Sequence, residues 1–151
     1  MNVYRICKKE HANLEGLGGI YSWGRWHRKG QRVVYTSESR SLSALETLVH
    51  VTDINILPSD LVVMEIDIPK TNIKIVTTEI ISEDWNSYPY SEKTVNYGYQ
   101  FLIDNKALAL KVPSVVIEKE YNYILNPNHK DYSNCTIKSI TPFSFDKRLS
   151  F

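Results

Sequence analysis

The sequence predicts a single compact α+β domain with a bent, mixed β-sheet and a few helices. The chain has 151 residues, of which 42% are hydrophobic, and this suits one domain with one core. Its apolar runs are short, mostly of strand length, and turn-forming residues separate them. We therefore expect about six short strands and two or three helices in one domain that spans residues 1–151.

The N-terminal part predicts a strand, a loop, a second strand and a helix. The first strand is expected over Asn2–Cys7, where side chains alternate between two faces, and a loop rich in glycine follows it. Residues 32–36 predict a short buried strand, and a serine-rich turn then leads into an amphipathic helix between residues 42 and 49. Ser43 and Glu46 have the spacing of a capping box at the start of that helix.

The remainder predicts further strands and one more helix. The expected strands are Leu61–Ile68, Ile73–Val76, Ala107–Lys111, Val115–Glu118, a strand that ends within Asn122–His129, and Ile137–Phe143. A proline turn is expected at Asn55–Asp60, and a helix is expected in the later half of residues 79–102, running towards Asp104. The tail, residues 143–151, is expected to close against the core or a partner.

Charge and composition exclude several classes of protein. The net charge is +1, from 18 basic and 17 acidic residues, which argues against a domain that binds nucleic acid directly. No apolar run approaches the ~20 residues that span a bilayer, and the N-terminus lacks an apolar signal core, so we expect a cytoplasmic protein without membrane contact. Cys7 and Cys135 have no metal-ligand spacing; two free thiols are favoured over a disulfide, and no metal is expected.

One strand–turn–helix unit carries three residue types that suit a single ligand. Arg25, Tyr35 and Glu46 lie 10 and 11 residues apart, and such a unit can gather them around one pocket. A guanidinium, an aromatic face and a carboxylate suit a ligand with phosphates, a flat ring and a developing positive charge. Each also has an ordinary structural reading: Glu46, beside the apolar stripe of its helix, also suits a cap or a solvated position.

Other candidate residues leave similar alternatives open. Arg5 in mid-strand is either a solvent-facing arginine or a phosphate contact, and Ser114 after Pro113 either caps a turn or presents its hydroxyl to the pocket. Trp26 is a core anchor or a stacking platform, and His27 is a polar loop residue or an acid–base group near neutral pH. The further candidates for the pocket lining are Tyr21 and Ser37.

The motifs together resemble the RES-domain family over nearly the whole chain. They are YRI at residues 4–6, GRW at 24–26, VVYTSESRSLSALETLVH at 33–50, VPS at 112–114 and NYILNPNH at 122–129. The resemblance implies an ADP-ribosyltransferase-like fold and a toxin of a bacterial toxin–antitoxin pair that consumes NAD+. It also implies an Xre-like DNA-binding antitoxin that covers the active site, and it leaves a homo-oligomer within that complex open.

Carried over by position, the family's functional residues fall on Arg25, Tyr35, Glu46 and Ser114. This implies catalytic roles for Arg25, Glu46 and Ser114, and substrate binding by Arg25 and Tyr35. The chain departs from the family pattern beside the pocket, where Trp23 and His27 replace a usual Gly and Asn. It departs again in the middle region, where Phe101 rather than a Trp follows Gly98.

The function that the resemblance implies is depletion of NAD+ by cleavage of its nicotinamide–ribose bond, with water or phosphate as acceptor. NAD+ is then the substrate, and no separate cofactor is expected. The alternative is an ADP-ribosyltransferase that modifies a protein with the same residues. Two further classes have less support. A catalytically silent binding module is disfavoured because the four functional residues are intact. A nucleic-acid-cleaving toxin is disfavoured because the net charge is near neutral and no plausible acid–base pair of histidines is present.

Overall fold

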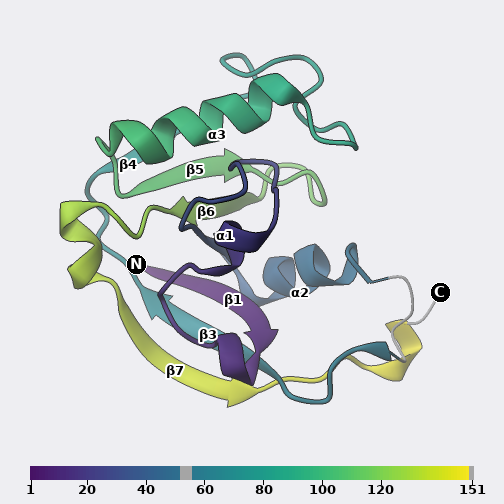
Figure 1. Cartoon of the computed structure of the whole chain (residues 1–151). Coiled ribbons are helices and arrows are strands. Elements are labelled where there is room, and N and C mark those ends of the chain that lie inside the picture. The colour runs from purple at the N-terminus through teal and green to yellow at the C-terminus, as the bar shows by residue number, and fades with distance from the viewer. Residues whose placement is uncertain (52–55, 150–151) are drawn as a thin grey trace.

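The computed structural model describes residues 1–51 and 56–149, which form a mixed β-sheet with helices around it (Figure 1). Seven strands are hydrogen-bonded in the order β4-β5-β6-β2-β1-β3-β7. They are β1 (Asn2–Lys8), β2 (Val34–Ser37), β3 (Leu61–Asp67), β4 (Ile73–Ile75), β5 (Ala109–Pro113), β6 (Tyr121–Leu125) and β7 (Thr136–Pro142). Only the β4–β5 pair is parallel, so the sheet is mixed, as the sequence predicts.

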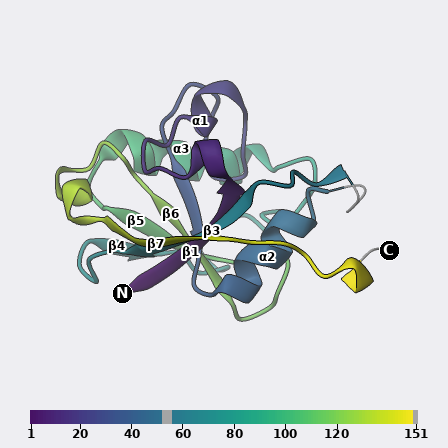
Figure 2. The ribbon, with the colours of Figure 1, turned by 90° about the horizontal axis from the view of Figure 1, so that it is seen from below.

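In the described part of the chain, three α-helices lie around the sheet: α1 (Gly18–Tyr21), α2 (Arg40–Leu48) and α3 (Glu92–Asp104). In Figure 1, α3 runs along β5 and β6, whereas α2 lies beside the β1–β3 half. The end of β7 and the 3₁₀ turn at Lys147–Leu149 lie near α2 in both views (Figure 1 and Figure 2). The α+β class is confirmed.

The strands divide the core into separate apolar clusters. One cluster contains Val3, Val34 and Met64, and the opposite face of the sheet carries a second cluster, around Trp26 and Ile124, beneath α3. A third, smaller cluster around Ile6 lies against α2. The two-faced reading of β1 is therefore confirmed, because its odd and even residues pack into different clusters.

The start of α2 differs from the prediction. Ser39 is the N-cap, and its side chain accepts a hydrogen bond from the backbone N–H of Leu42 at 3.1 Å. The capping box of Ser43 and Glu46 is wrong, because Ser43 lies inside the helix and is buried. Its hydroxyl instead accepts the backbone N–H of Ile6 at 3.0 Å, which ties α2 to β1.

The helix expected near Asp104 is present as α3, and Gly98 brings it against the segment that carries Arg25. A Cβ at Gly98 would lie 2.1 Å from the backbone oxygen of Trp26, so only glycine permits this approach. Phe101 is buried in the same cluster as Trp26. The departure from the family pattern at Phe101 is thus a change of core aromatic.

The expected strand at Val115–Glu118 is wrong, and the segment is a turn between β5 and β6. The hydroxyl of Ser114 accepts the backbone N–H groups of Val116 and Ile117, and Lys119 adopts a left-handed φ of 67°. These local bonds compete with strand pairing, so the apolar run turns back as a hairpin.

The predictions for the cysteines and for the tail are confirmed in the described residues. Cys7 and Cys135 are free thiols. Phe143 and Phe145 of the tail pack against the Ile6 cluster, so the tail does close on the core. Asn55 of the expected proline turn, and residues 150–151 of the tail, lie outside the described residues. Within the described chain, no helix has the length and apolar character needed to cross a membrane.

Candidate active site

Glu46 lies in the last turn of α2 and bonds side chains at the β5–β6 hairpin. Its Oε1 accepts hydrogen bonds from the Ser114 hydroxyl at 2.8 Å and from the Asn122 side-chain amide at 2.5 Å. Its Oε2 has no hydrogen-bond partner among the described residues and is not buried from solvent. The carboxylate is therefore fixed through one oxygen, and the other is free to face a ligand.

The two donors to Glu46 are themselves held in place. Ser114 is buried, and its hydroxyl also accepts the backbone N–H groups of the turn that follows β5. Asn122 accepts a hydrogen bond from the Ser37 hydroxyl at 2.7 Å through its Oδ1, which leaves its NH₂ group for Glu46. Ser114 thus caps the turn and also donates its hydroxyl hydrogen to Glu46. Ser37, on β2, orients Asn122 through a hydrogen bond.

Arg25 follows Gly24 in a tight loop and is about half-buried. Its Nη1 donates to the backbone carbonyls of Trp85 at 2.6 Å and Ser87 at 2.9 Å, and the guanidinium lies over the Tyr90 ring, 4.9 Å from its centroid. Both hydrogen-bond partners are neutral, and among the described residues no carboxylate forms an ion pair with the guanidinium. Its Nη2 and Nε have no partner among the described residues, and they remain available to an anion.

The negative charge of Glu46 acts on Arg25. Burial lowers the pKa of Arg25, and the negative charge of Glu46 opposes that effect, so the two groups are close enough to interact. They do not form an ion pair within 4.0 Å in the described chain. A guanidinium and a carboxylate that approach without pairing leave room for a ligand with a phosphate on one side and a cationic centre on the other.

Tyr35 is bonded at its hydroxyl by the loop that carries Arg25, and its side chain packs against the Trp26 cluster. Its hydroxyl accepts the backbone N–H of Trp26 at 3.0 Å and lies 2.8 Å from Nδ1 of His27. Burial raises the pKa of Tyr35, so its hydroxyl stays protonated at neutral pH. The residue as a whole is partly exposed. The hydroxyl is therefore used for positioning, and the ring is the part that can meet a ligand.

Gly24 makes this arrangement possible. A Cβ at Gly24 would lie 2.5 Å from Nδ1 of His27 and 2.8 Å from the Tyr35 hydroxyl. The loop also closes on itself, because Gly24 and His27 exchange two backbone hydrogen bonds. The glycine of the GRW motif is thus needed for the close approach of the loop to Tyr35.

Several predicted site residues lie elsewhere or act differently. Arg5 pairs with Met64 across β1 and β3 and shares its face of the sheet, so it lies opposite Tyr35. Trp26 is 3% exposed and is a core anchor. Tyr21 is 76% exposed in α1, and no recorded contact joins it to Glu46 or Arg25.

The structure adds residues that sequence reasoning missed. Asn122 is the first residue of the NYILNPNH motif. Its hydrogen bond to Glu46 depends on the register of β6 beside β2 and β5. Tyr90 and the carbonyls of Trp85 and Ser87 come from a segment without periodicity, so no pattern pointed to them. A polar residue at the start of an apolar strand was the one available signal for Asn122.

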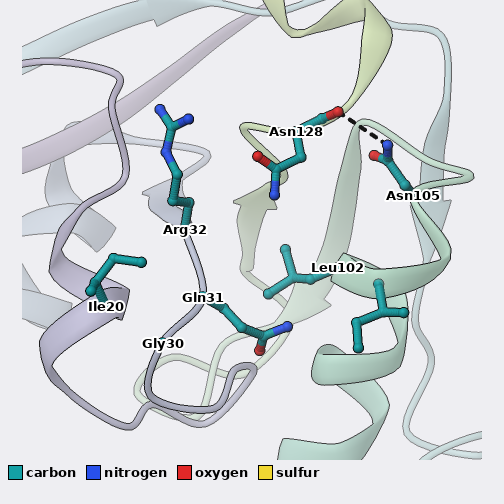
Figure 3. Close-up of a pocket in the computed structure, with 8 residues that line it drawn as sticks. Ile20, Gly30, Gln31, Arg32, Leu102, Asn105 and Asn128 are labelled. Carbon is teal, nitrogen blue, oxygen red and sulfur yellow. Dashed lines mark hydrogen bonds between the residues drawn. The ribbon is translucent and has the colours of Figure 1, made fainter.

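A hollow of about 520 Å³ lies away from this site, between α1, the loop at residues 30–32 and the end of α3 (Figure 3). Its lining includes Arg32, Leu102 and Asn128, and it includes none of the residues around Glu46. We therefore place the candidate site by its chemistry and not by its depth. Within residues 1–51 and 56–149, no cluster of three or more His, Cys, Asp or Glu side chains is suited to hold a metal ion.

Comparison with known proteins agrees with these features. The model of the RES domain family matches residues 2–146. The chain belongs to the RES-domain family. Toxin Res of Yersinia enterocolitica is 35% identical over 153 residues, which cover 99% of each chain. Toxin Res of Pseudomonas putida is 34% identical and also covers 99% of each.

Two further relatives of this RES-domain protein are informative. A protein of a Sphingobium species, named a Prs ADP-ribosylating toxin, is 29% identical over 143 residues, covering 93% of this chain and 88% of that protein. The crystal structure of the M. tuberculosis MbcT–MbcA toxin–antitoxin complex contains a chain with the same fold. Its TM-score is 0.77 at 14% identity, and the match covers 95% of this chain and 84% of that one.

Proposed function

We propose that this RES-domain protein is the toxin of a toxin–antitoxin pair and depletes NAD+ by cleaving the nicotinamide–ribose bond, with water or phosphate as acceptor. The observation that carries the proposal is the site itself. Glu46 is held through Oε1 by Ser114 and Asn122, its Oε2 has no hydrogen-bond partner among the described residues, and its negative charge acts on Arg25 without an ion pair between them. Near full-length relatives named Toxin Res support the role as a toxin.

Arg25 fits the pyrophosphate of NAD+. A guanidinium binds phosphate oxygens through paired, charge-assisted hydrogen bonds, and Nη2 and Nε of Arg25 are free to form them. The carbonyls of Trp85 and Ser87 hold the group in position before the ligand arrives. This pre-organisation lowers the entropy that binding would otherwise lose.

Tyr35 fits the nicotinamide. The nicotinamide ring of NAD+ is a flat cation, and an aromatic face attracts it. Tyr35 is partly exposed, its hydroxyl bonds the loop that carries Arg25, and the charge of Glu46 acts on Arg25. Tyr35 would thereby place the bond to be broken near the free oxygen of Glu46.

Glu46 supplies the charge that the reaction requires. When the bond from ribose to nicotinamide breaks, its electron pair stays on the ring nitrogen, and nicotinamide leaves as a neutral molecule. Positive charge then builds on the ribose, as in the oxocarbenium-like transition state of glycoside hydrolysis. Oε2 of Glu46 stabilises that charge, while water or phosphate adds to the ribose carbon and water gives up a proton. Because the leaving group is neutral, a second carboxylic acid is unnecessary.

The decisive experiment is incubation of the purified protein with NAD+ and identification of every product by mass. Free nicotinamide with ADP-ribose indicates hydrolysis, and nicotinamide with phosphorylated ADP-ribose indicates phosphorolysis. The Glu46→Gln protein is the matched control, since it keeps the shape of the site. Intact NAD+ after incubation with the active protein would contradict the proposal.

The second candidate function is transfer of ADP-ribose to a protein. The Sphingobium relative named a Prs ADP-ribosylating toxin favours it, because that protein matches 93% of this chain. The same residues would serve, and only the acceptor would differ. A gain of one ADP-ribose mass on a protein in a cell extract, without free ADP-ribose, would identify this activity.

A cell that makes such an enzyme must silence it, so we further propose a cognate Xre-like DNA-binding antitoxin that covers the site in the cytoplasm, where NAD+ is consumed. The MbcT–MbcA pair, a toxin–antitoxin complex with a chain of this fold, supports such a partner. Hydrogen exchange of the complex should show protection at residues 21–37, around Arg25 and Tyr35. Protection confined to the opposite face would point to indirect inhibition.

A further inference from the structure

His27 stands where the family pattern has an asparagine, and the structure gives both of its ring nitrogens a partner. The side chain is buried, with the residue 4% exposed. Nε2 lies 3.0 Å from the backbone carbonyl of Ser22, and Nδ1 lies 2.8 Å from the Tyr35 hydroxyl. It makes no recorded contact with Arg25 or Glu46, so a direct role in the reaction has no geometric support.

The partners fix the proton on the ring. A carbonyl oxygen only accepts, so Nε2 must carry the hydrogen that it donates to Ser22. In the neutral ring Nδ1 is then bare and accepts the hydrogen of the Tyr35 hydroxyl. Burial lowers the pKa of His27, partly opposed by the Ser22 bond, and this favours the neutral ring.

The Tyr35 hydroxyl is consequently held from two directions. The backbone N–H of Trp26 donates to it, and the same hydroxyl donates to Nδ1 of His27. The contact also reaches α1, because a Cβ on Gly19 would lie 3.1 Å from Cδ2 of His27, so the ring has little room to move. The hydroxyl end of the Tyr35 side chain is therefore anchored by two hydrogen bonds.

We propose that His27 is a positioning residue, which fixes the Tyr35 ring at the ligand site by accepting its hydroxyl hydrogen at Nδ1. The proposal rests on the proposed function, in which the Tyr35 ring meets the nicotinamide of NAD+. The physical role is pre-organisation: a ring that is already in place loses less entropy on binding.

Two isosteric substitutions separate the two bonds of the ring. Asn places its Oδ1 near the position of Nδ1, so His27→Asn keeps an acceptor for Tyr35 and loses the donor to Ser22. Gln places its amide nitrogen near the position of Nε2, so His27→Gln keeps the donor and loses the acceptor. His11→Gln is the matched control, because the His11 side chain is 63% exposed on the surface.

The experiment measures kcat and KM for NAD+, together with melting temperature, for these proteins and for Tyr35→Phe. His27→Gln and Tyr35→Phe should each raise KM about fivefold with little change in kcat, since each removes one neutral hydrogen bond that acts on binding. Combining them should raise KM no further. The KM of His27→Asn should stay close to the wild-type value and below that of His27→Gln, even when the melting temperature of His27→Asn falls.

Equal KM values for His27→Asn and His27→Gln, or KM values that simply follow melting temperature, would overturn the proposal. An activity-independent measurement is the flipping rate of the Tyr35 ring by NMR, which should rise in His27→Gln and not in His27→Asn. If the wild-type protein leaves NAD+ intact, the proposed function fails, and the ring-flipping comparison still decides the role of His27. Equal flipping rates in both variants would then refute it.

Discussion

Asn122 donates its side-chain amide to Oε1 of Glu46 at 2.5 Å, across 76 residues of sequence. Ser114 bonds the same oxygen, so both donors act on one side of the carboxylate. The consequence is directional: the charge of Glu46 is presented through Oε2.

Glu46→Gln should fold and bind NAD+ nearly as the wild type does, because its Oε1 still accepts from Ser114 and Asn122. It should lose about a hundred- to thousand-fold in kcat, because the charge that stabilises the transition state is gone. Turnover, NAD+ affinity and melting temperature measure the three effects. Glu10→Gln, with an exposed side chain, is the control. Near wild-type turnover by a folded Glu46→Gln protein would exclude Glu46 as the catalytic carboxylate.

Asn122→Asp should bring a second carboxyl group against Glu46. Two carboxylates this close share a proton near neutral pH, so the charge on Glu46 is reduced and kcat should fall about tenfold or more. Activity of the variant should recover as pH rises and both groups ionise. A pH–rate profile checks this. A variant with the wild-type profile would show that Asn122 does not control Glu46.

Arg25→Ala should weaken NAD+ binding by about tenfold or more, because the phosphate loses a charged partner. Arg25→Lys should restore only part of the affinity, since an ammonium lacks the bidentate fork. Titration calorimetry with NAD+ measures both. Arg32→Ala is the control: Arg32 also donates to a backbone carbonyl, but it lines the hollow away from the site. Equal losses for the two alanine variants would argue against a specific phosphate contact.

Gly24→Ala should destabilise the fold by about 1–3 kcal/mol, because the new methyl group would overlap His27 and the Tyr35 hydroxyl. Gly18→Ala is the control, since a Cβ there meets no atom within 4 Å. Urea unfolding of both variants gives the free energies. A Gly24→Ala protein as stable as Gly18→Ala would mean that the loop can move away without cost.

The stability of the protein should fall in acid partly through His27. Its pKa is lowered by burial in the folded state, so the unfolded chain binds the proton more readily. This contribution is fully present above the unfolded pKa of about 6.5 and is lost as pH falls through the folded value. The free energy of unfolding of His27→Asn should therefore decrease less than that of the wild type below pH ~6.5. Parallel decreases would show that His27 does not titrate in this way.

The sequence by itself determined the elements that depend on local pattern. Apolar alternation marked the strands, the helical stripe marked α2, and the order of the motifs identified the RES-domain family. It also selected Arg25, Tyr35, Glu46 and Ser114 as one set. In the structure Ser114 bonds Glu46, and the charge of Glu46 acts on Arg25. Those residues sit in short motifs whose order along the chain is informative without any knowledge of contacts.

Only the tertiary structure decided what each side chain touches. Ser43 was expected to cap the helix but bonds β1, because Ser39 is the N-cap and Ser43 lies inside the helix. Arg5 lies across the sheet from Tyr35, since strand register assigns each side chain to one of two faces. Asn122 reaches Glu46 only because β6 lies between β2 and β5, a pairing between segments far apart in sequence. Periodicity is a property of neighbours along the chain, whereas register and strand order depend on contacts between distant segments.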